Sequence, residues 1–216
     1  MGKGKLKKFA ELETFRNVYQ KPAPGLLAGK WASAHFQNDQ PLVLELACGK
    51  GDYTLALAKR YPQKNFIGVD IKGNRIWNGA RTALESSIEN AAFLRIFIDH
   101  IDEHFALGEV NDIWITFPDP YLRKSKKNKR LTSPKFLDLY RKILAPNGSI
   151  HLKTDSPQLF EYTQEIIAEQ GLEVLSKIDD VYKDPHDNEL LTSIQTYYEK
   201  MHLEDGRTIR YIHYRP

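Results

Sequence analysis

Short apolar runs alternate five times with amphipathic helical patterns along this chain. Strands joined by helical crossovers form parallel sheets that are covered by helices on both faces. The sequence therefore predicts an α/β fold with a single doubly wound, mostly parallel sheet of seven strands. The strands are predicted at residues 41–46, 65–69, 93–98, 112–117, 149–153, 172–178 and 208–214.

Capping signals set the limits of the helices between these strands. Residues 74–87 follow a helical pattern, and Ser133 is expected to cap the next long helix. A further helix is predicted from Ser156 to about Gln170, where Gly171 ends it. These helices supply the crossovers that parallel strands require.

The composition fits one globular domain in a reducing compartment. The chain has 216 residues, 41% of them hydrophobic, and contains no apolar run of 18 residues, so we expect neither a membrane-spanning helix nor a secretory signal. Cys48 is the only cysteine, which excludes an intrachain disulfide and favours a cytoplasmic location. His100 and His104 lack a third ligand at a suitable spacing, so no metal site is expected.

Positive charge is concentrated in two segments. Residues 1–30 carry seven Lys and Arg against two Glu, and residues 121–153 carry ten against one Asp. Because the whole chain has a net charge of +3, the remaining residues carry −11. We expect a domain over residues 39–216 with a basic insert at 121–131, preceded by a basic, partly mobile extension over residues 1–38. This pattern is typical of a polyanion-binding surface.

Acidic and glycine residues follow the predicted strands at the edge where ligands bind in open parallel sheets. The predicted cofactor site contains Glu45, Gly49, Gly51, Asp70 and Asp99, and Asp119 belongs to the same cluster of strand ends.

The chemistry of this edge favours an adenosine ligand with a positive charge and no phosphate. Ala47 and Thr54 stand where a dinucleotide-binding pattern would have glycines, so a pyrophosphate is poorly seated. The carboxylate of Glu45 suits an ammonium or sulfonium group. Asp70 can accept hydrogen bonds from both ribose hydroxyls, and Asp99 can reach an adenine edge. S-adenosylmethionine is therefore the predicted cofactor.

Asp119 follows the fourth predicted strand, at the position expected to face the transferable group. Pro118 and Pro120 fix the backbone on both sides of it, so its carboxylate is held in place. Six cations follow within residues 123–130, at the mouth of the predicted site. Such a positive strip favours a nucleic-acid substrate.

Further acceptors and aromatic rings lie at the ends of later segments. Guanine offers N1–H and an exocyclic amine as donors, so Asp155 or Glu199 could accept from it, while Tyr121 or Tyr197 could stack on it. The alternative is that the tyrosines belong to the core and Glu199 to the surface.

Five ordered motifs from about residue 42 to the C-terminus resemble the tRNA (guanine-N7)-methyltransferase family. Its E-L-G-C-G-x-G motif is similar to Glu45–Gly51, and its G-(V/I)-(D/E) element to Gly68–Asp70. Its F-P-D-P-W-P-K-K-R-H segment is similar to Phe117–Lys126. Its K-T-D and T-x-Y-E elements are similar to Lys153–Asp155 and Thr196–Glu199.

This resemblance implies a class I methyltransferase fold of Rossmann-like type and methyl transfer from S-adenosylmethionine to a guanine in the tRNA variable loop. It implies that Asp119 is catalytic and that Asp119 lines the cofactor site together with Glu45, Asp70 and Asp99. The chain departs from the family pattern at three places: Ala47 replaces Gly, Tyr121-Leu122 replaces Trp-Pro, and the K-K-R-H run is altered. The substrate-contacting positions that it implies are Arg123, Asp155, Thr196, Tyr197, Tyr198 and Glu199.

Three other functions remain as alternatives. The segment from Pro118 to Tyr121 is similar to the (D/N)-P-P-(Y/F) signature of methyltransferases that modify amino groups of adenine or cytosine. A nicotinamide-dependent oxidoreductase conflicts with the glycine pattern, and a non-catalytic RNA-binding module would not require the acidic strand ends. The lysine-rich start, Lys3–Lys8, is expected to be a mobile arm that strengthens tRNA binding. We expect a monomer or homodimer with tRNA as its partner.

Overall fold

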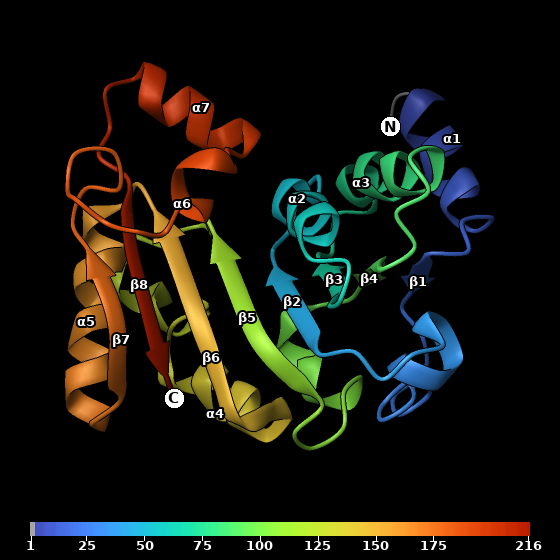
Figure 1. Cartoon of the computed structure of the whole chain (residues 1–216), viewed down its shortest axis with the longest axis horizontal. Helices are drawn as coiled ribbons and strands as arrows, with labels where there is room; N and C mark the ends of the chain where they lie inside the picture. Colours follow the sequence, from blue (N-terminus) through green and yellow to red (C-terminus); the bar gives the residue numbers. More distant parts are fainter. Residues whose placement is uncertain (1–2) are drawn as a thin grey trace.

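A single open sheet of eight strands forms the centre of the molecule, in the order β1-β4-β3-β2-β5-β6-β8-β7 (Figure 1). The computed structural model describes residues 3–216 and the side chains of residues 6–216; Met1 and Gly2, part of the predicted extension, lie outside the described residues. The strands are β1 (Val18–Gln20), β2 (Leu42–Leu46), β3 (Asn65–Val69), β4 (Ala91–Arg95), β5 (Val110–Thr116), β6 (Leu144–Thr154), β7 (Glu173–Ile178) and β8 (Arg210–Arg215).

The strand pairs are parallel except at one side of the sheet, where β8 pairs antiparallel with both β6 and β7. All seven predicted strands are present, so the predicted single, mostly parallel sheet is confirmed, although it has eight strands and not seven. The eighth strand, β1, lies in the predicted N-terminal extension and pairs with β4 at the edge of the sheet. The sequence did not predict β1, because its three residues, Val18–Gln20, are too few to show an alternating pattern.

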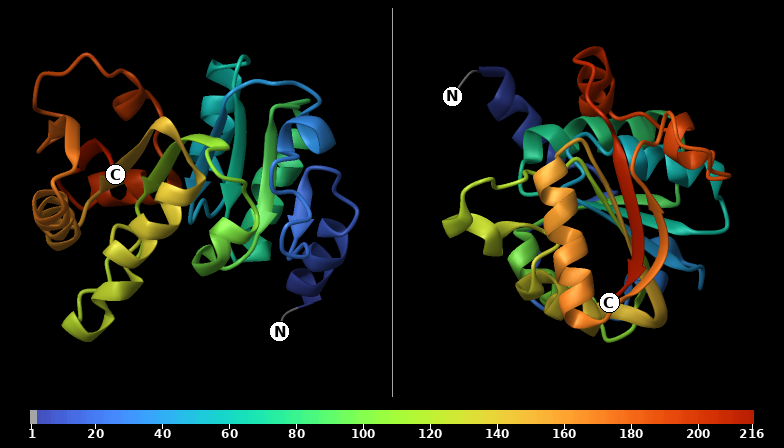
Figure 2. Two further views of the ribbon diagram at one scale, coloured as in Figure 1. Left: turned by 90° about the horizontal axis from the view of Figure 1, so that it is seen from below. Right: turned by 90° about the vertical axis from the view of Figure 1, so that its left-hand side faces the viewer.

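Helices cover both faces of the sheet (Figure 2). The helices are α1 (Lys3–Leu12), α2 (Asp52–Arg60), α3 (Gly73–Glu85), α4 (Pro134–Ile143), α5 (Pro157–Gln170), α6 (Leu190–Ser193) and α7 (Tyr197–Glu204), with shorter turns η1 (Trp31–Phe36), η2 (Ile98–Glu103) and η3 (Lys124–Lys129). One core cluster contains apolar side chains of α4 and α5, and the other those of α1, α2, α3 and α6.

The predicted helix caps are met at α5 and differ at α4. The Ser156 hydroxyl accepts a hydrogen bond from the Leu159 N–H at 3.2 Å, and Gly171 ends α5 with a φ of 62°. Ser133 precedes α4 as predicted, but its hydroxyl donates to the carbonyl of Asn128 instead. It therefore anchors the basic insert to the start of the helix.

The described part of the predicted extension packs against the same sheet as the rest of the chain. The Trp31 side chain is buried and stacks on Phe105 with 5.6 Å between ring centres, and its indole N–H donates to the carbonyl of His104. The segment Lys3–Lys8, expected to be a mobile arm, belongs to α1, which packs on α3. Within residues 3–216 no helix is both long and apolar enough to cross a membrane.

Candidate active site

A cleft of about 940 Å³ opens at the carboxyl ends of the central strands, where the strand order reverses between β2 and β5. Most of the predicted site residues line it, which confirms that the fold brings these distant segments together. Lining positions among them are Glu45, Gly49, Asp70, Asp99, Asp119, Asp155, Thr196, Tyr197 and Tyr198. Gly51, Arg123 and Glu199 do not line the cleft.

The loop after β2 turns sharply at three residues with left-handed backbone conformations. Ala47, Gly49 and Gly51 have φ angles of 55°, 57° and 73°. A Cβ atom at Gly51 would lie 2.5 Å from the ring of Phe93, so this glycine is required for packing of the loop against the sheet rather than for ligand contact. An L-residue in the left-handed region costs about 1–2 kcal/mol, so Ala47 holds strain at this turn.

Replacing Ala47 with glycine is expected to raise the free energy of unfolding by about 0.5–1 kcal/mol, because the relieved strain exceeds the added entropy of the unfolded chain. Thermal unfolding of the ligand-free protein would show a rise of roughly 2 °C in the Tm. Gly49→Ala is the matched reverse change, since a Cβ there meets no atom within 4 Å and adds only backbone strain. A Tm that falls in A47G would contradict this account.

Glu45 is buried at the end of β2, and hydroxyl and amide groups of neighbouring elements hold its carboxylate. The Thr54 N–H donates to it at 2.8 Å, and the hydroxyls of Thr54 and Thr116 donate at 2.5 and 3.0 Å. Burial raises the pKa of Glu45 to about 7, although these hydrogen bonds favour the charged form. A cation in the cleft would stabilise the charged carboxylate, which fits the predicted contact with an ammonium or sulfonium group.

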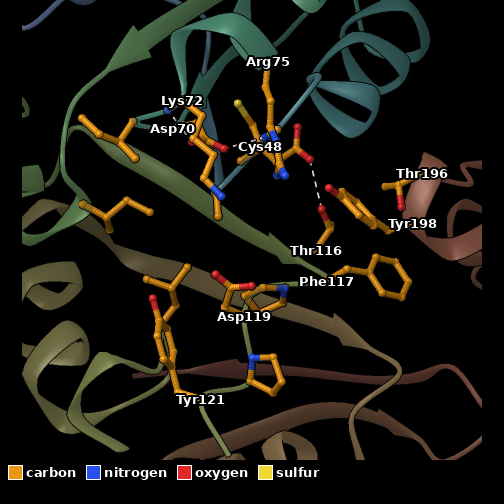
Figure 3. A pocket seen from close by; sticks show the side chains of 18 of the residues that line it. Cys48, Asp70, Lys72, Arg75, Thr116, Phe117, Asp119, Tyr121, Thr196 and Tyr198 are labelled. Carbon is orange, nitrogen blue, oxygen red and sulfur yellow. Dashed lines mark hydrogen bonds between the residues drawn. The ribbon is translucent and has the colours of Figure 1, made fainter. Parts of the chain in front are cut away.

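Asp70 is fixed by two backbone donors at the end of β3. Its two carboxylate oxygens accept from the N–H of Gly49 at 2.9 Å and of Lys72 at 2.8 Å (Figure 3). Each oxygen keeps a second lone pair for a ligand. Asp99, in η2, is half exposed and forms an ion pair with Lys135 of α4, so it faces the cleft with a cation already beside it.

The segment that carries Asp119 is held in a strained conformation. Phe117 and Tyr121, on either side of it, have φ angles of 49° and 43°. The Arg130 guanidinium donates to the carbonyls of Pro120 at 3.0 Å and Tyr121 at 3.2 Å, which anchors the returning end of the basic insert to this segment. Strained backbone that the surroundings hold in place is concentrated at functional sites.

The Asp119 carboxylate itself is exposed and forms no hydrogen bond or ion pair with the described residues. Figure 3 shows it on one side of the cleft, with Asp70 and Arg75 on the other. It is therefore free to act on a ligand between them.

The basic insert forms the exposed turn η3 beside the cleft. Asn128 and Lys129 line the cleft, whereas Arg123, which precedes the turn, does not. Because all residues from 122 to 129 are exposed, their cations remain hydrated and accessible.

The first turn of α7 forms the opposite wall. The Thr196 hydroxyl caps this helix by accepting from the Glu199 N–H at 3.1 Å. The Tyr197 N–H donates to Asp52 at 3.0 Å, which connects the wall to the start of α2. Both tyrosine rings are at least one-third exposed: the Lys50 ammonium lies 4.3 Å from the centre of Tyr197, and the Arg75 guanidinium 5.6 Å from that of Tyr198.

Glu199 points away from the cleft into the core. Its carboxylate is fully buried and lies 2.5 Å from the ammonium of Lys153, which is also fully buried. The Tyr182 hydroxyl donates to the same carboxylate at 2.8 Å. Glu199 is therefore neither placed to contact a guanine nor exposed at the surface, the two alternatives expected from the sequence. It forms a buried ion pair instead.

Lys153 connects three parts of the chain at the end of β6. Besides Glu199, its ammonium donates to the Tyr53 hydroxyl at 3.0 Å and to the carbonyls of Leu191 and Ile194. Burial lowers the pKa of Lys153 to about 8, and the carboxylate of Glu199 opposes that shift. This single side chain thus fastens α6 and α7 to the sheet.

Asp155 lines the cleft and already has a cationic partner, Arg207. Arg207 donates to it at 2.8 Å, and the His202 ring lies 3.6 Å away. A guanine at this position would have to share the carboxylate with Arg207.

Sequence reasoning missed several residues that line the cleft: Lys50, Lys72, Arg75, Thr116, Lys135 and Arg207. It also missed Thr54, which lies behind the cleft and donates to Glu45. Thr54 was noted only as a missing glycine, and Thr116 lies one residue inside a predicted strand. The pattern Thr196-x-x-Glu199 resembles a capping box and could have predicted the start of α7. No local signal pairs Lys153 with Glu199, because 46 residues separate them.

Comparisons with known proteins agree with this architecture. A family model described as "Putative methyltransferase" matches residues 39–211. The tRNA (guanine-N(7)-)-methyltransferase of Christiangramia forsetii is 46% identical over 99% of this chain and 98% of that protein. The enzyme of the same name from Porphyromonas gingivalis is 50% identical over 93% of this chain and 85% of that protein.

A solved structure of a 30S ribosomal A1408 methyltransferase from an uncultured bacterium superposes with a TM-score of 0.61. It is 19% identical and covers 83% of this chain and 89% of that one. At this identity the likeness concerns the fold, and it confirms the predicted class I methyltransferase architecture.

Proposed function

This chain belongs to the tRNA (guanine-N(7)-)-methyltransferase family, and on that premise we propose that it transfers a methyl group from S-adenosylmethionine to N7 of a guanine in tRNA. The observation that carries the proposal is the set of carboxylates around one cleft: buried Glu45, anchored Asp70 and free Asp119. We propose that the reaction takes place in the cytoplasm, where tRNA is available.

The donor set of the cleft fits S-adenosylmethionine. Asp70, with both oxygens oriented by backbone N–H groups, would accept from the ribose hydroxyls. Glu45 would face the cationic end of the molecule, and Asp99 would approach the adenine. The cofactor supplies an electrophilic methyl group on a positively charged sulfur.

The chain's own contribution to the reaction is orientation and electrostatic stabilisation. Guanine N7 has an in-plane lone pair and no proton, so no general base is needed. Positive charge begins on sulfur and ends on the methylated ring, and the rigidly held Asp119 carboxylate would stabilise it along the transfer. The backbone at Phe117 and Tyr121, where the Arg130 guanidinium holds the Tyr121 carbonyl, would fix the direction from which Asp119 acts.

The walls of the cleft would bind the RNA. Tyr197 and Tyr198 offer exposed rings for the unstacked base, and Thr196 and Asp155 lie beside them as polar contacts. The exposed cations of the insert, Arg123 included, would bind phosphates. Glu199 supports this wall through Lys153 rather than by touching the substrate. The proposal holds for a monomer or a homodimer.

Methyl transfer from labelled S-adenosylmethionine to unmodified tRNA, followed by nucleoside identification, tests the proposed function. We expect the label in 7-methylguanosine. Label in a methylated adenine or cytosine would instead favour an amino-group methyltransferase, and absence of label despite tRNA binding would refute the catalytic proposal.

A further inference from the structure

The N-terminal helix α1 is docked on α3 by specific contacts. Leu12 is buried in the core, and the Glu11 carboxylate accepts from the Trp77 indole at 2.8 Å. The Phe9 ring lies 4.7 Å from the Arg95 guanidinium and so close to Gly73 that a Cβ there would be 2.6 Å from it. Helix α1 therefore has a defined position on the protein.

This position extends the positive lining of the cleft. The Lys8 ammonium donates to Asn78 at 3.4 Å and lies 4.0 Å from the centre of the Trp77 ring. Asn78 follows Arg75 by three residues on α3, so the two are neighbours on one side of that helix. Arg75 lines the cleft, and Lys8 contacts Asn78, so Lys8 lies about one turn of α3 farther from the cleft than Arg75 does.

Lys7 adds a second accessible cation at the same place. Its side chain is 80% exposed, and its only ion-pair partner within the described residues is Glu11 at 3.8 Å. An exposed pair at this distance is weak, so the ammonium is available to a stronger anion.

Cations also border the other rim of the cleft. Lys129 and Lys135 line that wall, and the insert η3 continues it. Both views of Figure 2 show α1 and the insert projecting from the same side of the molecule. A polyanion crossing the cleft would meet positive charge before and after it.

We propose that docked α1 is a second phosphate-binding element, in which Lys7 and Lys8 bind the RNA backbone on the α3 side of the target guanine while the insert binds it on the other side. The inference rests on the proposed function, because it takes tRNA as the occupant. It assigns binding to a helix of fixed position and not to an arm that searches for RNA.

The double variant K7A/K8A tests the charge. Each phosphate contact contributes about 0.7–0.9 to the slope of log affinity against log salt concentration. We expect the slope for unmodified tRNA to fall by about 1.4–1.8 and the affinity at physiological salt to fall by roughly tenfold. Affinity for S-adenosylmethionine should stay the same.

K59A/R60A is the matched control, because it also removes two adjacent cations. They lie in the last turn of α2, at the end of the strands away from the cleft. Its salt slope should equal that of the unmodified chain. An unchanged slope in K7A/K8A, or an equal loss in K59A/R60A, would overturn the inference.

Phe9→Ala tests the docking without removing a charge. Loss of the ring removes the contacts of α1 with Gly73 and Arg95 and weakens its docking. Lys7 and Lys8 are then no longer held in place, so tRNA affinity should fall severalfold. Affinity equal to that of the unmodified chain would show that a tethered arm suffices, which overturns the docked helix. If the unmodified chain does not methylate guanine N7, the proposed function is wrong. If it does, but K7A/K8A and F9A bind tRNA as tightly as the unmodified chain, only the role of α1 is wrong.

Discussion

Lys153→Met is expected to lower the free energy of unfolding by about 3–5 kcal/mol, because it leaves the carboxylate of Glu199 buried without its cation. Methionine fills much of the same volume, so the loss reflects the uncompensated charge and the released carbonyls of α6 rather than a cavity. Equilibrium unfolding in urea measures the change.

The double variant K153M/E199Q separates charge from packing. Removing both charges should recover much of the lost stability, since the amide can still accept from the Tyr182 hydroxyl. A K153M protein within 1 kcal/mol of the unmodified chain would contradict the buried ion pair, as would a double variant no more stable than K153M.

Asp119→Asn is expected to slow single-turnover methyl transfer by about 10²–10³-fold, the usual effect of removing one preorganised electrostatic group. The amide keeps the shape of the side chain and removes the charge that would follow the methyl group. Because Asp119 forms no hydrogen bond or ion pair with the described residues, the fold should tolerate the change.

Rates should be measured with both substrates saturating, so that binding does not enter. Asp39→Asn provides the same chemical change at an exposed position preceding β2, at the end of that strand away from the cleft, and should leave the rate unaltered. A near-normal rate in D119N would refute the role assigned to Asp119.

The sequence predicted those features that depend on local periodicity and on strand-end geometry. Buried parallel strands are short apolar runs, and the residues after them meet at one edge, so Asp70 and Asp119 could be assigned to the cleft without a structure. Glu199 could not be placed in this way. The direction of the Glu199 side chain depends on which face of α7 packs against the sheet and on Lys153 of β6. Both depend on tertiary packing and not on the local sequence.

The N-terminal segment escaped prediction for a related reason. A run of lysines is compatible with an arm or with a helix, and only the apolar side chains of Phe9 and Leu12 decide between them once α3 is present to receive them. Strand β1 likewise exists because β4 offers an open edge.

The pairing of β1 with β4 also affects how this chain avoids self-association. An exposed sheet edge presents unpaired amide and carbonyl groups that other chains can join. Here residues 18–20 cover that edge, and Trp31 closes the core beneath it. A polypeptide trimmed to the part matched by the family model, residues 39–211, would uncover β4 and lose Trp31 from the core. Residues 18–31 are thus expected to limit edge-to-edge association of this sheet.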